Sequence, residues 1–202
     1  MLEWVLPSVL FGLLALLNGA RLLHERQALR MAYSLFGAML WIGFFLAVQR
    51  RPPAVARERA PLAVATALAS SVVTVHIGTA EASTSSVRLS IAIVVMAVGW
   101  MVSVWSLAVL GRRFGVLADA RGLVVRGPYR VVRHPLYLGE LLNLAGLVVG
   151  SSRWVLPCLA WSALVAVQLT RSVYEERVLE RAFPEYRQYR RRVRSRIVPG
   201  VI

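Results

Sequence analysis

Long apolar runs separated by short polar segments dominate the pattern of this chain. A helix needs roughly 20 consecutive apolar residues to cross the hydrocarbon core of a bilayer, and several runs are close to that length. The pattern therefore predicts an all-α fold, a polytopic transmembrane helical bundle of about six spans, with five spans as the alternative. The six predicted spans are residues 4–23, 32–48, 62–78, 87–110, 136–149 and 154–170.

The polar segments between the runs predict which ends of the helices meet. Residues 150–153 form a turn that is too short for anything but an antiparallel hairpin, so the last two spans are predicted to lie side by side. Arginine is concentrated in the segments 50–61 and 111–135 and in the tail from residue 171 onward. Because basic loops mark the cytoplasmic side of a membrane protein, we expect these three segments there. The segment 79–86 and the turn 150–153 are then predicted on the opposite side.

Composition and charge favour a membrane protein over a soluble one. Hydrophobic residues make up 57% of the chain, compared with roughly 45–50% in soluble domains. The formal charge is +14, and all 24 basic residues are arginine. Since the arginines lie between apolar runs, we expect contacts with anionic lipid headgroups, not with nucleic acid. Arg21, Arg26 and Arg30 do not fit the predicted orientation, and the single cysteine, Cys158, offers neither an intramolecular disulfide nor a metal site.

Two polar segments flank the predicted hairpin, and function is expected where they meet. They are residues 126–140 and residues 171–176, and the hairpin brings them together on one membrane face. In the first, Pro135 suits the first position of a helix, where free backbone N–H groups are expected to bind a polar ligand. In the second, Arg171 and Glu175 are four residues apart and share a helix face. The residues alone therefore predict a membrane protein with a polar cytoplasmic pocket.

The string GPYRVVRHPLYLGE at 127–140, followed by YEERVLERAFPEYRQY at 174–189, resembles the isoprenylcysteine carboxyl methyltransferase family and its bacterial relatives. The resemblance covers the chain from about residue 110 to the C-terminus. It implies transfer of a methyl group from S-adenosyl-L-methionine at the membrane face. The cofactor pocket is expected between the C-terminal hairpin, the preceding loop and the tail. The chain then divides into a four-span region, 1–110, and a catalytic region, 111–202.

The resemblance also implies roles for individual residues. Glu175 matches the acid that binds the cofactor, and Arg171, one turn earlier, matches an arginine that binds the substrate; both are the expected catalytic residues. A glutamine that some members use has no counterpart in the short loop near 114–120, and the spacing from Phe183 to Tyr186 is one residue tighter than in eukaryotic members. The expected cofactor-binding residues are Arg121, Gly122, Leu123, Val124, Tyr129, His134, Pro135, Leu136, Tyr137 and Glu175.

These residue types fit methyl transfer from a sulfonium to a carboxylate. A carboxylate is already a nucleophile at neutral pH, and Arg171 is able to hold it through two hydrogen bonds. Tyrosine faces near the sulfonium stabilise its positive charge. The resemblance therefore implies a carboxyl O-methyltransferase that acts on a lipophilic, isoprenylcysteine-like substrate, and we expect it in the bacterial inner membrane with its site on the cytoplasmic face.

Three alternatives stay open at this point. A phospholipid N-methyltransferase needs a group that removes a proton from the amine, and only Glu140 and Glu176 offer one. A sterol-type membrane reductase uses NADPH and has a related Arg-His pattern, but Pro135 and the pair Glu175–Glu176 favour the methyltransferase. A lipid-binding protein that keeps the pocket without turnover is the non-enzymatic alternative. No metal and no nucleic acid are expected as partners.

Overall fold

The computed structural model describes residues 8, 9, 12, 13, 15, 16, 20, 27–49, 56, 57, 61, 65, 66, 69, 70, 73, 81–113, 119, 120 and 122–201. This part of the chain is helical apart from one short antiparallel pairing, so the predicted helical architecture is confirmed. The helices are α2 (Ala28–Gln49), α4 (Ser86–Leu110), α5 (Pro135–Gly150), α6 (Val155–Ala182) and α7 (Tyr186–Arg192). The predicted spans 4–23 and 62–78 lie largely outside the described residues.

The other predicted spans correspond to helices of the structure. Residues 32–48 fall within α2, residues 87–110 form α4, and residues 136–149 form α5. Residues 154–170 form the first part of α6, which continues without a break to Ala182. Two described helices, α4 and α6, are long and apolar enough to cross a membrane, whereas α5 is a shorter apolar helix. The number of spans stays a prediction.

Most of the apolar surface of α4 and α6 is exposed, which favours membrane association. Only 22% of the apolar stretch of α4 and 28% of that of α6 are buried within the protein. The core helix of a soluble protein buries most of such a stretch, because exposed apolar surface is unfavourable in water. The exposed side of α4 carries apolar side chains at helical spacing, among them Val87, Ile91, Val94, Val98, Met101 and Trp105.

The other side of α4 is a narrow seam of small residues that packs against α5. Its buried positions recur every three or four residues, so they share one face of the helix. Gly99 lies against the backbone of α5 at Asn143, and Gly139 of α5 lies against the backbone of α4 at Ser103. Small residues at such a contact allow two helix backbones to approach closely in a membrane, where the hydrophobic effect gives no attraction between helices. The buried positions of α4 are Leu89, Ala92, Met96, Gly99, Ser103 and Ser106.

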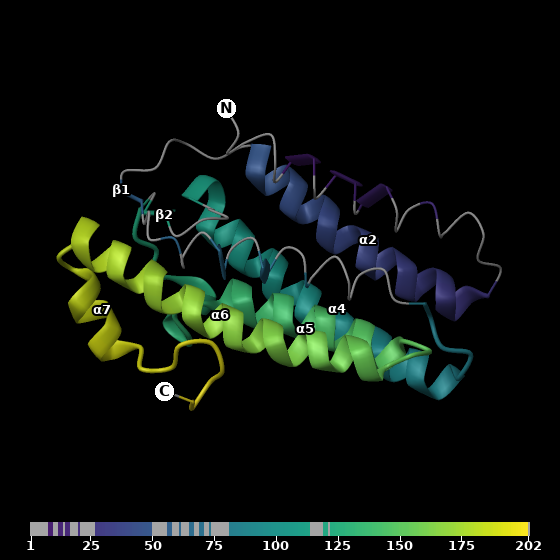
Figure 1. Cartoon of the computed structure of the whole chain (residues 1–202). Coiled ribbons are helices and arrows are strands. Elements are labelled where there is room, and N and C mark those ends of the chain that lie inside the picture. Colours follow the sequence, from purple (N-terminus) through teal and green to yellow (C-terminus); the bar gives the residue numbers. More distant parts are fainter. Residues whose placement is uncertain are drawn as a thin grey trace.

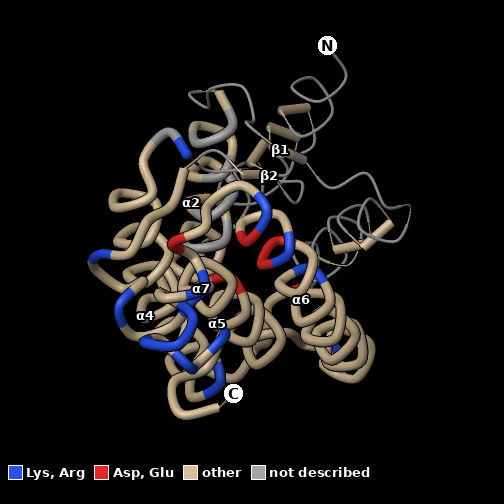
Figure 2. The backbone as a smooth tube through the Cα atoms, turned by 90° about the vertical axis from the view of Figure 1, so that its left-hand side faces the viewer, with Lys and Arg blue, Asp and Glu red and all other residues tan. Residues whose placement is uncertain are grey.

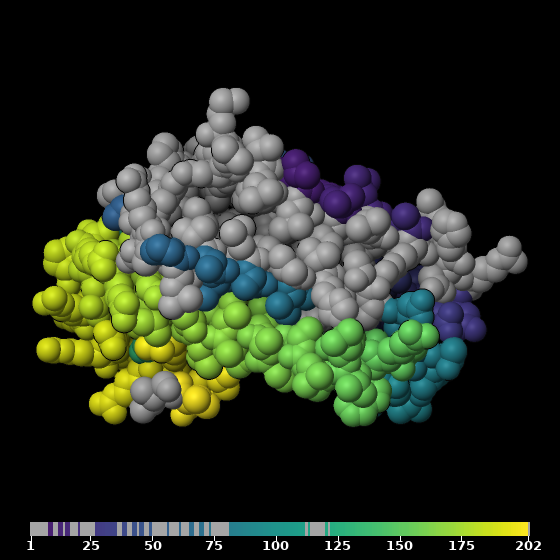
Figure 3. All heavy atoms as spheres, viewed as in Figure 1, coloured from purple at the N-terminus to yellow at the C-terminus, as the bar shows by residue number. Residues whose placement is uncertain are grey.

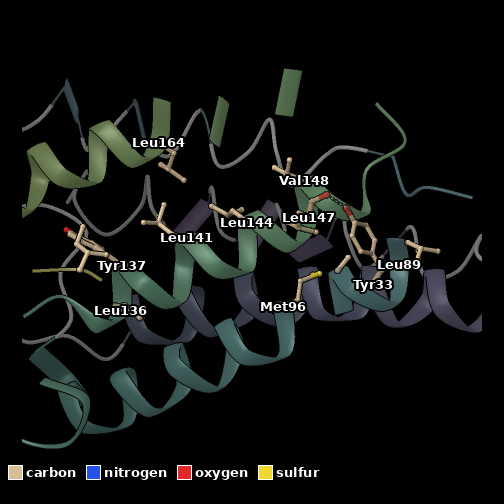
Figure 4. Close-up of a cluster of buried hydrophobic side chains, with 12 residues drawn as sticks. Tyr33, Leu89, Met96, Leu136, Tyr137, Leu141, Leu144, Leu147, Val148 and Leu164 are labelled. Carbon is tan, nitrogen blue, oxygen red and sulfur yellow. Dashed lines mark hydrogen bonds between the residues drawn. The ribbon is translucent and has the colours of Figure 1, made fainter. Parts of the chain in front are cut away.

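The apolar core runs along α5 and is shared by α2, α4 and α6. Figure 4 shows Tyr137 and Leu136 at one end of this core and Tyr33 at the other. The Tyr33 hydroxyl donates a hydrogen bond of 2.7 Å to the carbonyl oxygen of Leu147, which joins α2 to α5 in the buried region. Leu144 and Leu164 are fully buried between α5 and α6.

The two segments predicted on the non-cytoplasmic side lie against each other. Ala82 and Ser151 form an isolated antiparallel bridge, and the Ser83 amide donates to the Gly150 carbonyl at 2.7 Å. Arg88 completes this end, because its guanidinium donates to carbonyl oxygens at the C-terminus of α5, including that of Ser151 at 2.7 Å. A cation at the carbonyl end of a helix also stabilises the helix dipole.

The three basic segments meet at the opposite end of the bundle. Strand β1 (Ala56–Arg57) pairs with β2 (Asp119–Ala120), which joins the loop 50–61 to the loop 111–135. Ala120 packs against Val178 on the last part of α6. Figure 1 shows α7 and the C-terminal tail at this same end. In Figure 3, α6 is a green band along the exposed lower edge that leads to the yellow tail.

We expect the small-residue seam to be sensitive to a single added methyl group. A Cβ at position 139 would lie 2.8 Å from the Ser103 backbone nitrogen and 2.9 Å from the Gly99 carbonyl oxygen. Gly139→Ala should therefore lower the free energy of unfolding by about 1–3 kcal/mol, measured by thermal unfolding in detergent. Gly43→Ala on α2, where a Cβ meets nothing within 4 Å, is the control and should be neutral or stabilising. Equal stability of the two variants would contradict the seam.

Candidate active site

A Gly-Pro turn positions the first aromatic residue of the site. The 3-10 helix η2 (Gly127–Arg130) begins at Gly127, whose φ of +59° is a left-handed conformation that favours glycine. Tyr129 is buried within this same 3-10 helix. The carbonyl oxygen of Tyr129 accepts a 2.7 Å hydrogen bond from the Tyr189 hydroxyl of α7. Burial, together with the nearby Glu175 carboxylate, raises the pKa of Tyr129, which stays a neutral phenol.

The start of α5 is tied to the C-terminal tail. Pro135 occupies the first turn of the helix, as the sequence predicted. The backbone N–H groups of Arg133 and His134 donate to the carbonyl oxygens of Ser195 at 3.0 Å and Arg196 at 2.8 Å. The expectation that N–H groups at this helix start are free for a ligand is therefore wrong for these two residues. The carbonyl oxygens of the tail satisfy both of them.

Four of the predicted site residues form one cluster between α5 and α6. The Tyr137 hydroxyl donates a hydrogen bond to Oε1 of Glu175, across the hairpin. The rings of His134 and Tyr137 are stacked, with centroids 5.3 Å apart and an interplanar angle of 9°. His134 Nδ1 lies 3.5 Å from Glu175 Oε2. The Arg171 guanidinium lies over the Tyr137 ring, 5.1 Å from its centroid, within the range of a cation–π interaction.

A chain of polar side chains extends from this cluster toward the bundle interior. Arg171, which is buried, donates to Ser70 Oγ and to Gln168 Oε1, both at 3.1 Å. The Gln168 amide in turn donates to Glu140 Oε2 at 2.7 Å. Ser70 belongs to the predicted span 62–78, so that segment reaches the cluster at this residue. The site thus extends from Glu175 past Arg171 to Glu140.

The carboxylate of Glu176 is buried and shared by several cations. Its side chain is 5% exposed, and Oε1 accepts from Arg133 Nε at 2.9 Å and from Arg196 Nε at 3.1 Å. His134 Nε2 lies 3.3 Å from the same oxygen, and Arg190 lies 3.8 Å from the other. Figure 2, which looks onto the end with α7, shows acidic residues in red near the middle with arginines in blue around them. Glu176 therefore holds the loop, α6 and the tail together.

Sequence reasoning missed this use of Glu176, Arg133 and Arg196. The signal was present, because consecutive helical residues point about 100° apart and the pair Glu175–Glu176 must face different partners. The arginine-rich tail offered cations for the second carboxylate. Gln168, an uncharged polar residue within an apolar run, was the second signal that the pattern contained.

The remaining predicted cofactor-binding residues lie in the loop before α5, in the apolar core or outside the described residues. Arg121 lies outside the described residues, and Gly122 has a φ of +143°. Leu123 packs against Tyr186 and its neighbours on α7 and the tail. Val124 is buried, and Leu136 belongs to the apolar core between the helices. Their predicted contacts with a cofactor stay predictions.

We expect removal of the buried Glu176 charge to destabilise the protein strongly. Glu176→Gln leaves Arg133 and His134 with an uncompensated charge in a buried site, and breaking such a group costs about 3–5 kcal/mol. Glu180→Gln is the matched control on the same helix, because its partner Arg190 is 48% exposed and a surface pair contributes about 0–1 kcal/mol. Denaturation in detergent compares the two, and a Glu176→Gln variant as stable as Glu180→Gln would contradict the role of this carboxylate.

We also expect a pH dependence of stability that comes from His134. Burial alone would lower the pKa of His134, but hydrogen bonds to Glu175 and Glu176 outweigh it and raise the pKa above the ordinary 6.5. The stabilisation is complete below the unfolded pKa and is lost as pH rises through the higher pKa of the folded protein. The melting temperature should therefore fall as pH rises above about 6.5, and this fall should be weaker in His134→Gln. Parallel curves for the two proteins would contradict an ionised His134.

The comparisons with known proteins each match slightly less than half of this chain. The cobalt-zinc-cadmium resistance protein CzcN of Cupriavidus metallidurans is 39% identical over 93 residues, which are 43% of this chain and 42% of that protein. The chain thus covers less than half the length of this relative. A sequence model of the family described as phospholipid methyltransferase matches residues 87–186, slightly less than half of the chain. This match, which includes α4, α5, α6 and the cluster between them, indicates a membrane methyltransferase.

Proposed function

We propose that this chain is an integral membrane methyltransferase that transfers a methyl group from S-adenosyl-L-methionine to a lipophilic acceptor. The observation that carries the proposal is the hydrogen bond between Tyr137 at the start of α5 and Glu175 on α6. It brings the two polar segments of the sequence into one site at the basic end of the bundle. The family match to phospholipid methyltransferases supports a lipid acceptor.

The side chains of the cluster suit this cofactor, which supplies a methyl group on a positively charged sulfonium. Glu175 is 21% exposed, so its carboxylate remains accessible to the cofactor's ammonium group. The face of Tyr129 is able to stabilise the sulfonium charge, whereas His134 and Arg171 already lie against the ring of Tyr137. His134, stacked on Tyr137 and held by Glu175, fixes the orientation of both. Transfer by in-line displacement depends on such positioning and on exclusion of water, which apolar helices on both sides supply.

A carboxylate on an isoprenylcysteine-like lipid is the first candidate acceptor. Arg171 is the buried cation next to Tyr137, and a guanidinium suits a carboxylate better than a lysine does. A carboxylate also needs no base, so positioning by Arg171 is sufficient for this reaction. The resemblance of residues 127–140 and 174–189 to isoprenylcysteine carboxyl methyltransferases supports this candidate.

An amine on a phospholipid is the second candidate acceptor, and the position of one residue, Glu140, supports it. Glu140 lies next to the Gln168–Arg171 pair and is a carboxylate suited to receive a proton from an amine. The family match is also to phospholipid methyltransferases.

We propose a bacterial inner membrane location with the site on the cytoplasmic side, because the arginine-rich α7 and tail surround the site end.

We expect purified protein in detergent to bind S-adenosylmethionine or its demethylated product. Glu175→Ala and His134→Ala should each weaken binding by about 10-fold or more, since hydrogen bonds to charged groups contribute about 1.5–3 kcal/mol. Isothermal calorimetry measures this, and Glu185→Ala, an exposed residue at the start of α7, is the control. Absence of binding by the wild type, together with clear binding of NADPH, would instead indicate the reductase.

The stability of the methylated product in base distinguishes a carboxylate acceptor from an amine acceptor. Protein in membranes supplied with methyl-labelled S-adenosylmethionine should transfer the label to extracted lipid. A methyl ester loses the label in base, whereas a methylated amine keeps it. Arg171→Lys keeps the charge but loses the planar fork, so it should slow transfer to a carboxylate by at least 10-fold if Arg171 contacts that acceptor. Label confined to the aqueous phase would contradict a lipophilic acceptor.

A further inference from the structure

Glu140 is the acidic residue of this cluster whose carboxylate keeps an unused oxygen. It follows Tyr137 by three residues on α5 and is therefore one turn further into the apolar part of the hairpin. Gln168 donates to Oε2, and among the described residues Oε1 has no hydrogen-bond partner. The side chain is half-buried. A carboxylate among membrane helices is costly, so it is expected to serve a function.

The other carboxylates of the site are already engaged. Glu176 is surrounded by the cations that hold the tail, and its oxygens lie within 4 Å of Arg133, Arg196 and Arg190. Glu175 accepts from Tyr137 with one oxygen and lies near His134 with the other. A proton arriving at either residue would break several buried contacts. Glu140 is the carboxylate of the cluster that is able to take a proton while Gln168 keeps its hydrogen bond.

The orientation of Glu140 is fixed through Gln168 by Arg171. A guanidinium only donates, so the Gln168 amide must turn its oxygen toward Arg171. The NH2 group then has to face Glu140, and it holds Oε2 at 2.7 Å. Gln168 is fully buried within α6, and this arrangement has no alternative amide orientation that keeps both bonds. Arg171 thus determines which oxygen of Glu140 is left for another molecule.

We propose that Glu140 contacts the methyl acceptor and removes its proton, and that the acceptor is the amine of a lipid. The inference rests on the proposed methyl transfer and chooses between its two acceptors. The ammonium N–H bond breaks, and the proton goes to Glu140 Oε1. The nitrogen lone pair then forms the bond to the methyl carbon, and the electron pair of the carbon–sulfur bond goes to sulfur. A carboxylate acceptor has no proton to lose, so it would leave Glu140 without a role in the reaction.

The test measures methyl transfer by the full-length protein in vesicles of two compositions. One contains phosphatidylethanolamine, a lipid with a primary amine, and the other contains an S-prenylated N-acetylcysteine, a lipid with a carboxylate. The variants are Glu140→Gln and Glu140→Asp, with Glu185→Gln as the exposed acidic control. Cofactor binding by calorimetry reports folding, because Glu140 is not expected to contact the cofactor.

We expect wild-type protein to methylate the amine lipid, with a base-stable product. Glu140→Gln should lower kcat on that lipid by about 100-fold or more, the usual contribution of a general base, while cofactor affinity changes less than twofold. Glu140→Asp should keep part of the rate and shift the rising limb of the pH–rate profile, which a purely structural residue would not do. The control variant should match the wild type.

Different results would reject different parts of the proposal. An amine-methylation rate in Glu140→Gln within threefold of the wild type would overturn the role of Glu140 and leave the methyltransferase intact. Transfer to the carboxylate lipid alone would also overturn it, with the same consequence. Failure of the wild type to bind the cofactor or to label either lipid would reject the proposed function itself. If Glu140→Gln does not fold, an Asp variant with an unshifted pH profile overturns the role.

Discussion

The site end of this protein depends on one buried carboxylate, that of Glu176. It neutralises Arg133 in the loop before α5 and Arg196 in the tail, and it lies 3.3 Å from His134. Buried charges are tolerated only when opposite charges and hydrogen bonds compensate them. The fold therefore has to bring loop, helix and tail to a single point, and the neighbouring residue Glu175 is presented on the adjoining face of α6 as a consequence.

The seam between α4 and α5 gives this end a firm support. Gly99 and Gly139 have no side chains that would hold the two backbones apart. A similar close contact occurs further along the helices, where Gly146 of α5 lies against the backbone of α4 at Ala92. The position of Tyr137 is thereby fixed from one side by α4, while Arg171 fixes it from the other. Polar side chains in the site are then able to hold their geometry without a soluble domain around them.

The sequence was sufficient to predict the helical architecture and the meeting of its two polar segments. A turn of four residues permits only an antiparallel hairpin, so the approach of Tyr137 to Glu175 followed from chain connectivity alone. The adjacent positions of Glu175 and Glu176 indicated that they face different partners, but which of the two meets the tail was not predictable, because it depends on which helix face the tail approaches. Gln168 and Ser70 were also missed, since single polar residues in apolar runs do not indicate their partners.

The pairing of the tail with the loop before α5 has a consequence for the order in which the protein is made. The amides of Arg133 and His134 donate to the carbonyl oxygens of Ser195 and Arg196, which follow them by more than 60 residues in the chain. During synthesis α5 and α6 are therefore made before these two partners. Until then the start of α5 has unpaired backbone groups and Glu176 lacks one of its cations. The backbone and charge contacts at the start of α5 are therefore complete only when the tail is present.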